Sequence, residues 1–188
     1  MYGDITPSEK RLKAKRDYQK YLRKVLKAAT KTYHQLHAND RADVLKTVYN
    51  INSIRHQLHE KAVELGYVKK CTDSMAVCKW HCCKWHFPKN LNHVDLVMTA
   101  CSISSEEQRA LEDQLAFDNG KYECPLLGEK GCSLSFDSRP LVCSNAYPCF
   151  LGDPYHGFLE KQRNGINIQL TLLKEILQKG RATLSEGR

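Results

Sequence analysis

The placement of the cysteines constrains this chain more than any other feature. All nine lie between positions 71 and 149, and the 70 residues before them contain none. The first residues, MYGDITPSEKRLK, lack the apolar stretch of a secretory signal, so we expect a cytoplasmic protein. In such a reducing compartment a cysteine set more often binds metal than forms disulfides, and an odd count leaves one thiol unpaired. We therefore predict a metal-binding cysteine module.

Length and charge indicate one domain with two functional parts. At 188 residues, 41% apolar and 27% charged, the chain has the size and composition of a soluble globular protein. No apolar stretch is long enough to span a membrane. Residues 1–70 contain 16 Lys and Arg against 7 Asp and Glu, a net charge of +9, whereas the remaining residues have a net charge of −1. The basic N-terminal third is therefore distinct from the cysteine-rich part.

Residues 1–70 have the pattern of two amphipathic helices. Thr6 can cap the start of a first helix, and Pro7 suits its first helical position. A second helix is expected to begin at the capping residues Asn39 and Asp40 and to end at Gly66. The two apolar stripes, with steps of three or four residues, are Tyr18, Leu22, Val25, Ala29, Tyr33 and Leu36, then Val44, Val48, Ile51, Ile54, Leu58, Ala62 and Leu65. We predict an antiparallel helical hairpin whose stripes cover each other or the cysteine module.

The first helix is expected to carry a basic face opposite its apolar stripe. Such a face, interleaved with Tyr18 and Tyr21, can bind phosphates by non-specific charge pairing, although most lysine-rich faces are simply solvated. An acidic partner, nucleic acid or protein, is therefore one interpretation. The candidate residues for binding it are Lys13, Lys15, Arg16, Lys20, Arg23, Lys24 and Lys27.

The rest of the chain is expected to form the cysteine module, residues 71–156, and a C-terminal helix, residues 157–188, packed on the same domain. Ser104 begins a helix that stops near Gly120, and segments 122–127 and 132–136 flank glycines in the manner of a short β-hairpin. The last helix is expected to end near Gly180. The predicted fold class is mostly α: an N-terminal antiparallel helical hairpin, a small cysteine-cluster module with a short β-hairpin, and a C-terminal helix.

The cysteine spacing supplies two groups of ligands. A thiolate-bound metal ion or iron–sulfur cluster needs sulfurs that converge from separate turns, and the predicted hairpin and the turn at Arg139 and Pro140 would bring the second group together. The predicted metal ligands are Cys78, Cys82, Cys83, Cys124, Cys132, Cys143 and Cys149, with Cys71 and His81 as additional candidates. Cys101 lies in an apolar segment and is expected in the core.

The motifs around these cysteines resemble a known family. In order they read Cys78-x3-Cys82-Cys83, Cys124-Pro-Leu-Leu, Gly131-Cys132-Ser-Leu and Arg139-Pro-Leu-Val-Cys143. This order is similar to that of the YkgJ-type cysteine-cluster family, zinc- or iron-chelating modules with a CxxCxxCC block, and the resemblance covers residues 71 to 150. A related module in flagellin lysine methylases is associated with a [4Fe–4S] cluster. The resemblance implies a metal centre and favours an iron–sulfur cluster over zinc.

The chain departs from the family pattern at several positions. The first block lacks one cysteine, for which Cys71 or His81 would substitute. Phe136 stands where the family tends to have Tyr, and Ser144 replaces the usual Arg. The doubled CKWH at residues 78–86 does not encode two sites, because its second copy is closed by Phe87 and not by a cysteine. Its tryptophans are expected to shield the centre.

Three functional hypotheses follow from the sequence. In the first, the metal centre has a structural, redox or accessory role. In the second, the protein is a cluster-dependent group-transfer enzyme that acts on a protein substrate. In the third, it is a zinc-stabilised protein that binds nucleic acid or the ribosome through its basic helices. The chain lacks a P-loop, a dinucleotide-binding glycine motif and an HExxH motif, and no catalytic residue is assigned.

Overall fold

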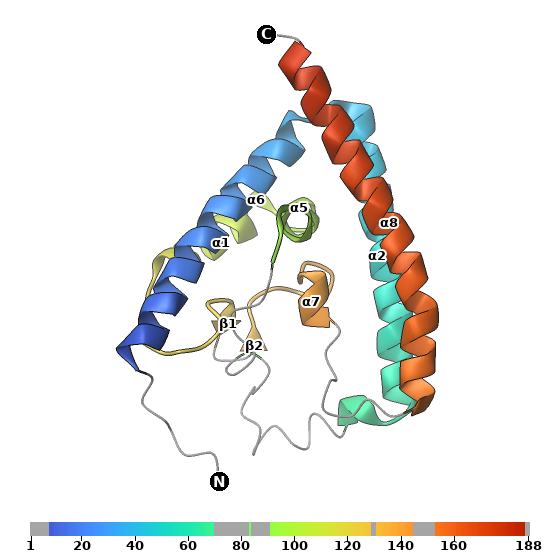
Figure 1. The fold of residues 1–188 in the computed structure, drawn as a ribbon, viewed down its shortest axis with the longest axis horizontal. Helices are drawn as coiled ribbons and strands as arrows, with labels where there is room; N and C mark the ends of the chain where they lie inside the picture. The colour runs from blue at the N-terminus through green and yellow to red at the C-terminus, as the bar shows by residue number, and fades with distance from the viewer. Residues whose placement is uncertain (1–7, 70–82, 84–90, 129–130, 145–152, 187–188) are drawn as a thin grey trace.

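The computed structural model describes residues 8–69, 83, 91–128, 131–144 and 153–186, and most of them are helical (Figure 1). The predicted mostly α class is confirmed. The helices are α1 (Glu9–Gln35), α2 (Ala38–Glu64), α5 (His93–Cys101), α6 (Ser105–Ala116), α7 (Leu141–Ser144) and α8 (Asp153–Glu186). The strands β1 (Leu127–Gly128) and β2 (Gly131–Cys132) pair antiparallel, so the predicted short hairpin is present with two residues in each strand.

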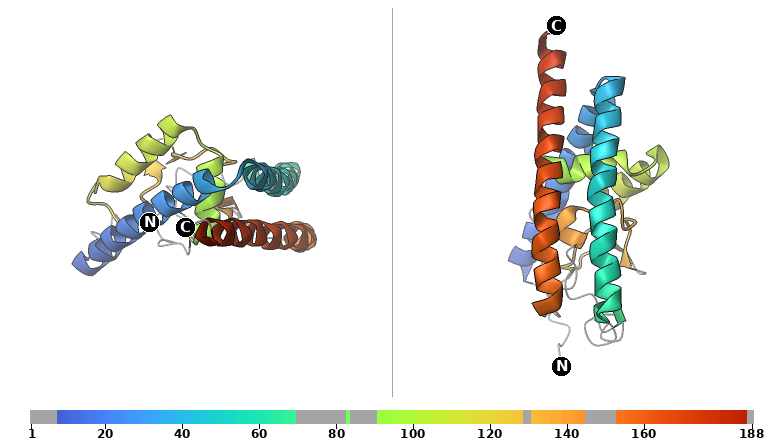
Figure 2. Two further views of the ribbon diagram at one scale, coloured as in Figure 1. Left: turned by 90° about the horizontal axis from the view of Figure 1, so that it is seen from above. Right: turned by 90° about the vertical axis from the view of Figure 1, so that its right-hand side faces the viewer.

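The two N-terminal helices follow each other through a tight turn and then diverge. α1 packs against α5 and α6, whereas α2 packs along α8, and the views in Figures 1 and 2 show both arrangements. Helices α5 and α7 and the β-hairpin lie inside the angle that α1 and α2 form, and α6 passes behind α1 (Figure 1). The two stripes were predicted to cover each other or the cysteine module. The stripe of α1 packs on α5 and α6, which belong to the predicted module, whereas α2 packs along the C-terminal helix α8, so the two stripes do not cover each other.

α1 begins slightly later than predicted and buries a wider stripe. Its first residue is Glu9, and the Ser8 side chain makes no capping hydrogen bond, although the Ser8 carbonyl accepts from the N–H groups of Arg11 and Leu12. Thr6 and Pro7 lie outside the described residues. The buried residues of α1 are Lys15, Gln19, Leu22, Leu26, Ala29 and Thr30. Two polar residues therefore extend the stripe toward the N-terminus.

α2 and α8 form an antiparallel pair around a common apolar core. Val44 and Ile51 from α2 and Leu173 from α8 are fully buried in the cluster that also includes α1 and α5. Across the pair, Asn50 Nδ2 donates to Gln169 Oε1 at 3.3 Å. α8 starts at Asp153 and makes smaller contacts with α1 and α5. It continues to Glu186, so the predicted helix end near Gly180 is wrong.

Gly180 is a close-packing position and not a helix stop. A Cβ at this position would lie 2.3 Å from Leu36 Cδ2, and Leu36 itself is buried. We expect Gly180→Ala to lower the free energy of unfolding by up to about 2 kcal/mol, because overpacking costs about 1–3 kcal/mol and the gain in helix propensity offsets about 1 kcal/mol of that. The matched control is Gly157→Ala on the same helix, where a Cβ meets nothing within 4 Å. In chemical denaturation the control should be neutral or stabilised, and equal behaviour of the two variants would contradict the close packing.

Helices α5 and α6 are both started by capping boxes. Asn92 and Asp95 exchange hydrogen bonds at the start of α5, and Ser104 and Glu107 do so at the start of α6, where the sequence predicted it. α6 ends at Ala116, and Gly120 takes a positive φ of 68° in the following loop. Among the described residues, no helix is both long and apolar enough to cross a membrane.

Candidate metal centre

Four of the seven predicted ligand cysteines belong to the described residues. They are Cys83, Cys124, Cys132 and Cys143, all half-buried and none in a disulfide. The predicted ligands Cys78, Cys82 and Cys149, and the additional candidates Cys71 and His81, lie outside the described residues, as do Trp80 and Trp85. The site can therefore be built from the second cysteine group and one member of the first.

The backbone brings these four cysteines to one region from four separate segments. The Cys124 N–H donates to the Cys83 carbonyl at 2.8 Å, which joins the two cysteine groups across 40 residues of chain. The Leu127 N–H then donates to the Cys124 carbonyl at 2.9 Å, and Leu127 pairs with Cys132 in the β-hairpin. Cys143 lies in the single turn of α7.

The electrostatic environment of Cys124 reflects this convergence. Burial, above all, raises the pKa of the Cys124 thiol to about 12, and negative charge on the thiolates of Cys83, Cys143 and Cys132 raises it further. A hydrogen bond from the Leu126 backbone acts in the opposite direction. A buried thiol surrounded by three others stays protonated unless a cation compensates the charge.

These sulfurs are grouped without completing a ligand set. Within the ranges that the structure describes, no three or more Cys, His, Asp or Glu side chains are arranged to hold a metal ion. The donor chemistry nevertheless fits a soft metal, because all four groups are thiols. The remaining predicted donors are those outside the described residues.

Helix α1 holds the loop that carries Cys124. Lys15 is 1% exposed, and its Nζ donates to Asp118 Oδ1 at 2.9 Å and to Asn119 Oδ1. Gln19 Nε2 donates to the Phe117 carbonyl at 2.9 Å. Lys15 was predicted to lie on the basic face and bind an acidic partner, and that prediction is wrong: its ammonium is committed to the 117–125 loop.

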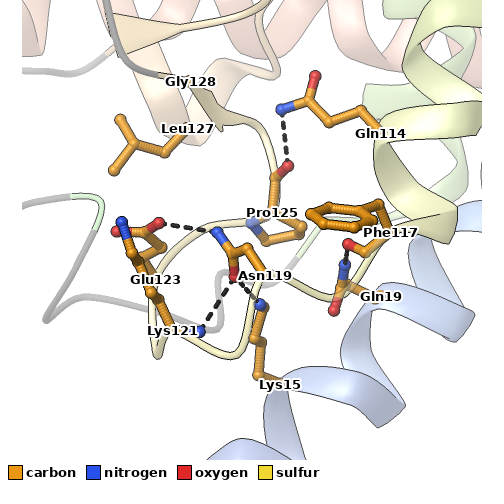
Figure 3. A pocket seen from close by; sticks show the side chains of 10 residues that line it. All are labelled: Lys15, Gln19, Gln114, Phe117, Asn119, Lys121, Glu123, Pro125, Leu127 and Gly128. Atoms are coloured by element: carbon orange, nitrogen blue, oxygen red, sulfur yellow. Dashed lines mark hydrogen bonds between the residues drawn. The ribbon is translucent and has the colours of Figure 1, made fainter.

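An open cavity of about 470 Å³ lies between this loop and α1 (Figure 3). Asn119 Nδ2 donates to Glu123 Oε1 at 2.9 Å, and Gln114 Nε2 donates to the Pro125 carbonyl at 2.9 Å. Glu123 and Pro125 flank Cys124 in the sequence, so these hydrogen bonds hold the Glu123 side chain on one side of that cysteine and the Pro125 backbone on the other. The view shows these side chains directed to one another across the loop (Figure 3).

Helix α2 holds the loop that joins Cys132 to Cys143. Arg55, 2% exposed, donates from Nη2 to the Phe136 carbonyl at 2.5 Å and from Nη1 to the Asp137 carbonyl at 3.3 Å. Its guanidinium also lies over the Phe136 ring, 4.9 Å from the centroid. On the surface, His56 Nε2 lies 2.7 Å from Asp137 Oδ1. Phe136 stands where the YkgJ-type family tends to have Tyr, and its ring packs against Arg55 and His56 of α2.

Helix α5 positions the turn that contains Cys143. The Thr99 hydroxyl donates to the Ser138 carbonyl at 2.8 Å, and Arg139 Nε donates to the Leu134 carbonyl at 3.0 Å. Burial raises the pKa of the Asp95 carboxyl, while backbone hydrogen bonds from Asn92 and Leu141 and the charge of Lys174 lower it. Asp95 therefore ties the first residue of α7 to α5, two residues before Cys143.

Sequence reasoning missed Lys15, Arg55 and Asp95, although the signal for two of them was present. Arg55 lies four residues after Ile51 and three before Leu58, which is the spacing of the apolar stripe itself. Lys15 lies seven residues before Leu22, so it falls on the buried stripe and not on the opposite face. A charged residue within an apolar stripe indicates a buried partner elsewhere in the chain.

Cys101 behaves differently from the other described cysteines. Burial raises the pKa of its thiol to about 11, its Sγ donates to the Met98 carbonyl at 3.2 Å, and its side chain packs against the apolar core. The prediction that Cys101 is a core residue agrees with this packing.

No family model, curated protein or solved structure matches the chain. The resemblance to the YkgJ-type family therefore rests on the order of the motifs in the sequence, and the candidate centre rests on the grouping of Cys83, Cys124, Cys132 and Cys143.

Proposed function

We propose that the protein binds a metal centre through its cysteine module, with an iron–sulfur cluster favoured, zinc a close second, and a structural, redox or accessory role. The observation that carries this proposal is the backbone hydrogen bond that brings Cys124 to Cys83, with Cys132 in the adjoining β-hairpin and the charge of Cys143 acting on the Cys124 thiol, because soft metals and iron–sulfur clusters take thiolates from separate segments. The preference for iron–sulfur comes from the family resemblance alone and is an analogy.

Three features of the surroundings support the proposal. Lys15 of α1, Arg55 of α2 and Asp95 of α5 hold the loops of Cys124 and Cys143, and metal ligands are typically held in place by hydrogen bonds of this kind. Burial of the Cys124 thiol limits access of water to that sulfur. The cations Arg55 and Arg139 would offset the net charge of −2 that four thiolates leave on Zn²⁺ or on a [4Fe–4S]²⁺ cluster.

The decisive experiment is a metal and sulfide analysis of the full chain purified without oxygen, together with its visible spectrum. A brown protein that contains iron and acid-labile sulfide, with broad absorption near ~400 nm, supports the iron–sulfur form. A colourless protein with stoichiometric zinc supports the zinc form. A folded protein with neither metal, which takes up neither after anaerobic reconstitution, rejects the proposal.

Metal binding should depend strongly on pH. A metal must displace the Cys124 proton, and the pKa of that thiol lies at about 12. Below that pH, the apparent metal affinity therefore increases about tenfold per pH unit for each proton that binding releases. We therefore expect zinc affinity, measured by competition with a chromophoric chelator, to increase steadily from pH 6 to pH 8. An affinity that is flat over this range would show that protonated thiols are not the ligands.

A second candidate function, binding of an acidic partner, is favoured by the exposure of α1. The exposed cations on this helix without a carboxylate partner in the described structure include Lys13, Lys20, Arg23 and Lys24. In contrast, Lys27 Nζ lies 3.5 Å from Glu112 Oε2, and Arg16 Nη1 lies 3.8 Å from Asp118 Oδ2. We propose that the four exposed cations form a weak phosphate-binding face. Neutralising Lys13, Lys20 and Lys24 together should abolish retention on RNA or DNA at low salt, and unchanged retention would reject this function.

A further inference from the structure

Helices α2 and α8 form one layer of the molecule, and the outer face of this layer is open to solvent. The right-hand view of Figure 2 shows the two helices side by side, with the other elements behind them. Exposed large apolar side chains gather on this pair: Leu45, Tyr49 and Val63 on α2, and Ile168 and Leu172 on α8. Such a grouping of apolar side chains on a protein surface marks an interaction site.

Tyr49 and Ile168 lie on the outer side of the layer. At about 100° per residue, Tyr49 lies about 160° around α2 from Ile51, and Ile168 lies about 140° around α8 from Leu173. Ile51 and Leu173 are completely buried in the core, whereas Tyr49 is 74% exposed and Ile168 is 60% exposed. The two helices therefore turn apolar side chains to both sides, and no described residue covers the outer ones.

Contacts between the two helices show which residues lie at the same level. Asn50 hydrogen-bonds to Gln169, and a Cβ at Gly165 would lie 3.2 Å from Ile54 Cδ1. Both contacts fit one antiparallel register, in which each residue forward on α2 corresponds to one residue back on α8. In this register Tyr49 is level with residue 170 of α8, midway between Ile168 and Leu172.

On each helix the exposed apolar residues lie between a lysine and a glutamate on the same face. The two stripes are Lys46, Tyr49 and Glu60 on α2, and Lys161, Ile168, Leu172 and Glu175 on α8. Within each stripe the steps are three, four, seven or eleven residues, which retain one face of a helix. All four charged side chains are exposed, and within the described part of the chain none of them has an ion-pair partner.

Both stripes run from lysine to glutamate, so antiparallel alignment places opposite charges at the same end. In the register of the pair, Lys46 is level with residue 173 and Glu60 with residue 159. Glu175 and Lys161 are each two residues from those levels, which is about 3 Å along a helix axis. The outer face is therefore complementary to itself in charge at both ends and apolar in the middle.

We propose that this outer face of α2 and α8 is the interface of a homodimer, with a two-fold axis parallel to the helices. Such an axis keeps every residue at its level and places α2 opposite the partner's α8. Tyr49 then packs on the partner's Ile168, while Lys46 faces the partner's Glu175 and Glu60 faces the partner's Lys161. Every neighbouring helix is antiparallel, as in an up-and-down four-helix bundle.

The size of the face meets the requirement of a stable dimer. The 27 residues of α2 extend for about 40 Å, and two helices packed side by side are about 20 Å wide. The resulting area of about 800 Å² is what each partner contributes to a standard protein–protein interface. The face contains none of the cysteines, so the proposal does not depend on the metal centre.

The first test measures the dimer dissociation constant of the full chain by analytical ultracentrifugation. Tyr49→Glu should weaken the dimer at least roughly a hundredfold, because it places a charge in the apolar centre of the interface. The matched control is Phe117→Glu, which changes another exposed aromatic residue, at the end of α6. The control should dimerise as wild type does. If circular dichroism shows that Tyr49→Glu is unfolded, Ile168→Glu takes its place.

The second test is a charge reversal that checks the direction of the two-fold axis. Lys46→Glu should weaken the dimer roughly tenfold, because a symmetric dimer contains each contact twice and both become repulsive. The double variant Lys46→Glu with Glu175→Lys restores opposite charges and should recover the wild-type constant. Lys24→Glu makes the same change in net charge on α1 and should leave dimerisation unchanged.

Three results would overturn the proposal. The first is a wild-type chain that stays monomeric up to about 1 mM, the weakest dimer that would be expected from such a face. The second is a folded Tyr49→Glu variant that dimerises like wild type, which would place any dimer contact elsewhere. The third is a Lys46→Glu defect that Glu175→Lys does not repair, because α2 would then not face the partner's α8.

Discussion

Cys124→Ser is expected to abolish metal binding, leaving less than roughly a tenth of the wild-type metal content. Cys124 is at the centre of the group, where Cys83, Cys132 and Cys143 act on its thiol. A serine hydroxyl does not ionise at neutral pH and cannot replace a thiolate on a soft metal. Because metal-binding energy contributes to folding, the Cys124→Ser variant should also be several kcal/mol less stable than the metal-loaded wild type. Elemental analysis and thermal denaturation measure both effects.

The matched control for this variant is Cys101→Ser. The Cys101 thiol already donates to the Met98 carbonyl, so a hydroxyl can retain that hydrogen bond, and the residue lies outside the thiol group around Cys124. We expect its metal content to equal that of wild type and its stability to change by about 1 kcal/mol. A Cys124→Ser protein that retains full metal content would show that Cys124 is not a ligand, whatever the behaviour of Cys101→Ser.

Lys15→Met is expected to destabilise the protein by about 2–3 kcal/mol, the largest effect among substitutions of the basic helix. The ammonium of Lys15 is 1% exposed and holds Asp118 and Asn119 in the loop that leads to Cys124. Methionine retains the apolar stem but leaves those oxygens without their donor. Lys13→Met, two residues earlier on the exposed side, should change stability by less than about 0.5 kcal/mol.

The pH dependence gives a second test of the same contact. The Lys15 hydrogen bond is the main cause that lowers the pKa of Asp118 below its usual range. A carboxyl whose pKa is lower in the folded than in the unfolded chain stabilises the fold above the unfolded pKa of about 3.9, and this stabilisation is lost as the pH falls through the folded pKa. The difference in unfolding free energy between Lys15→Met and wild type should therefore shrink below pH ~4. A difference that persists unchanged in acid would indicate lost packing and not lost charge pairing.

Much of the secondary structure follows from residues close to one another in the sequence. The two helices before Gly66, the capping box at Ser104 and Glu107, and the hairpin next to Cys132 were all predicted and are present, although α1 begins at Glu9 and α2 at Ala38, ahead of the predicted cap at Asn39 and Asp40. Each depends on side chains and hydrogen bonds within a few residues, so no distant contact is needed to predict it. The end of the last helix was wrong, because Gly180 serves a contact with Leu36 that lies far away in the chain.

The candidate site was predictable in its ligand types but not in its supports. Cysteine spacing placed Cys124, Cys132, Cys143 and Cys149 in one group. Cys149 lies outside the described residues, and the charges of Cys132 and Cys143 act on the Cys124 thiol. The helices that hold them were not predicted, because the places of Lys15 and Arg55 on apolar stripes indicate burial but do not say which distant groups they contact. The prediction of which cysteines bind metal stays a prediction.

The sequence by itself determined the helical class and the gathering of the thiols into one half of the chain, because both follow from composition and local periodicity. Only the tertiary structure decided which helix covers which stripe and which cations are buried. Lys15 meets Asn119 across 104 residues, and Arg55 meets Phe136 across 81. Burial of a charge depends on compensation from such distant groups, and local sequence carries no record of which group will supply it.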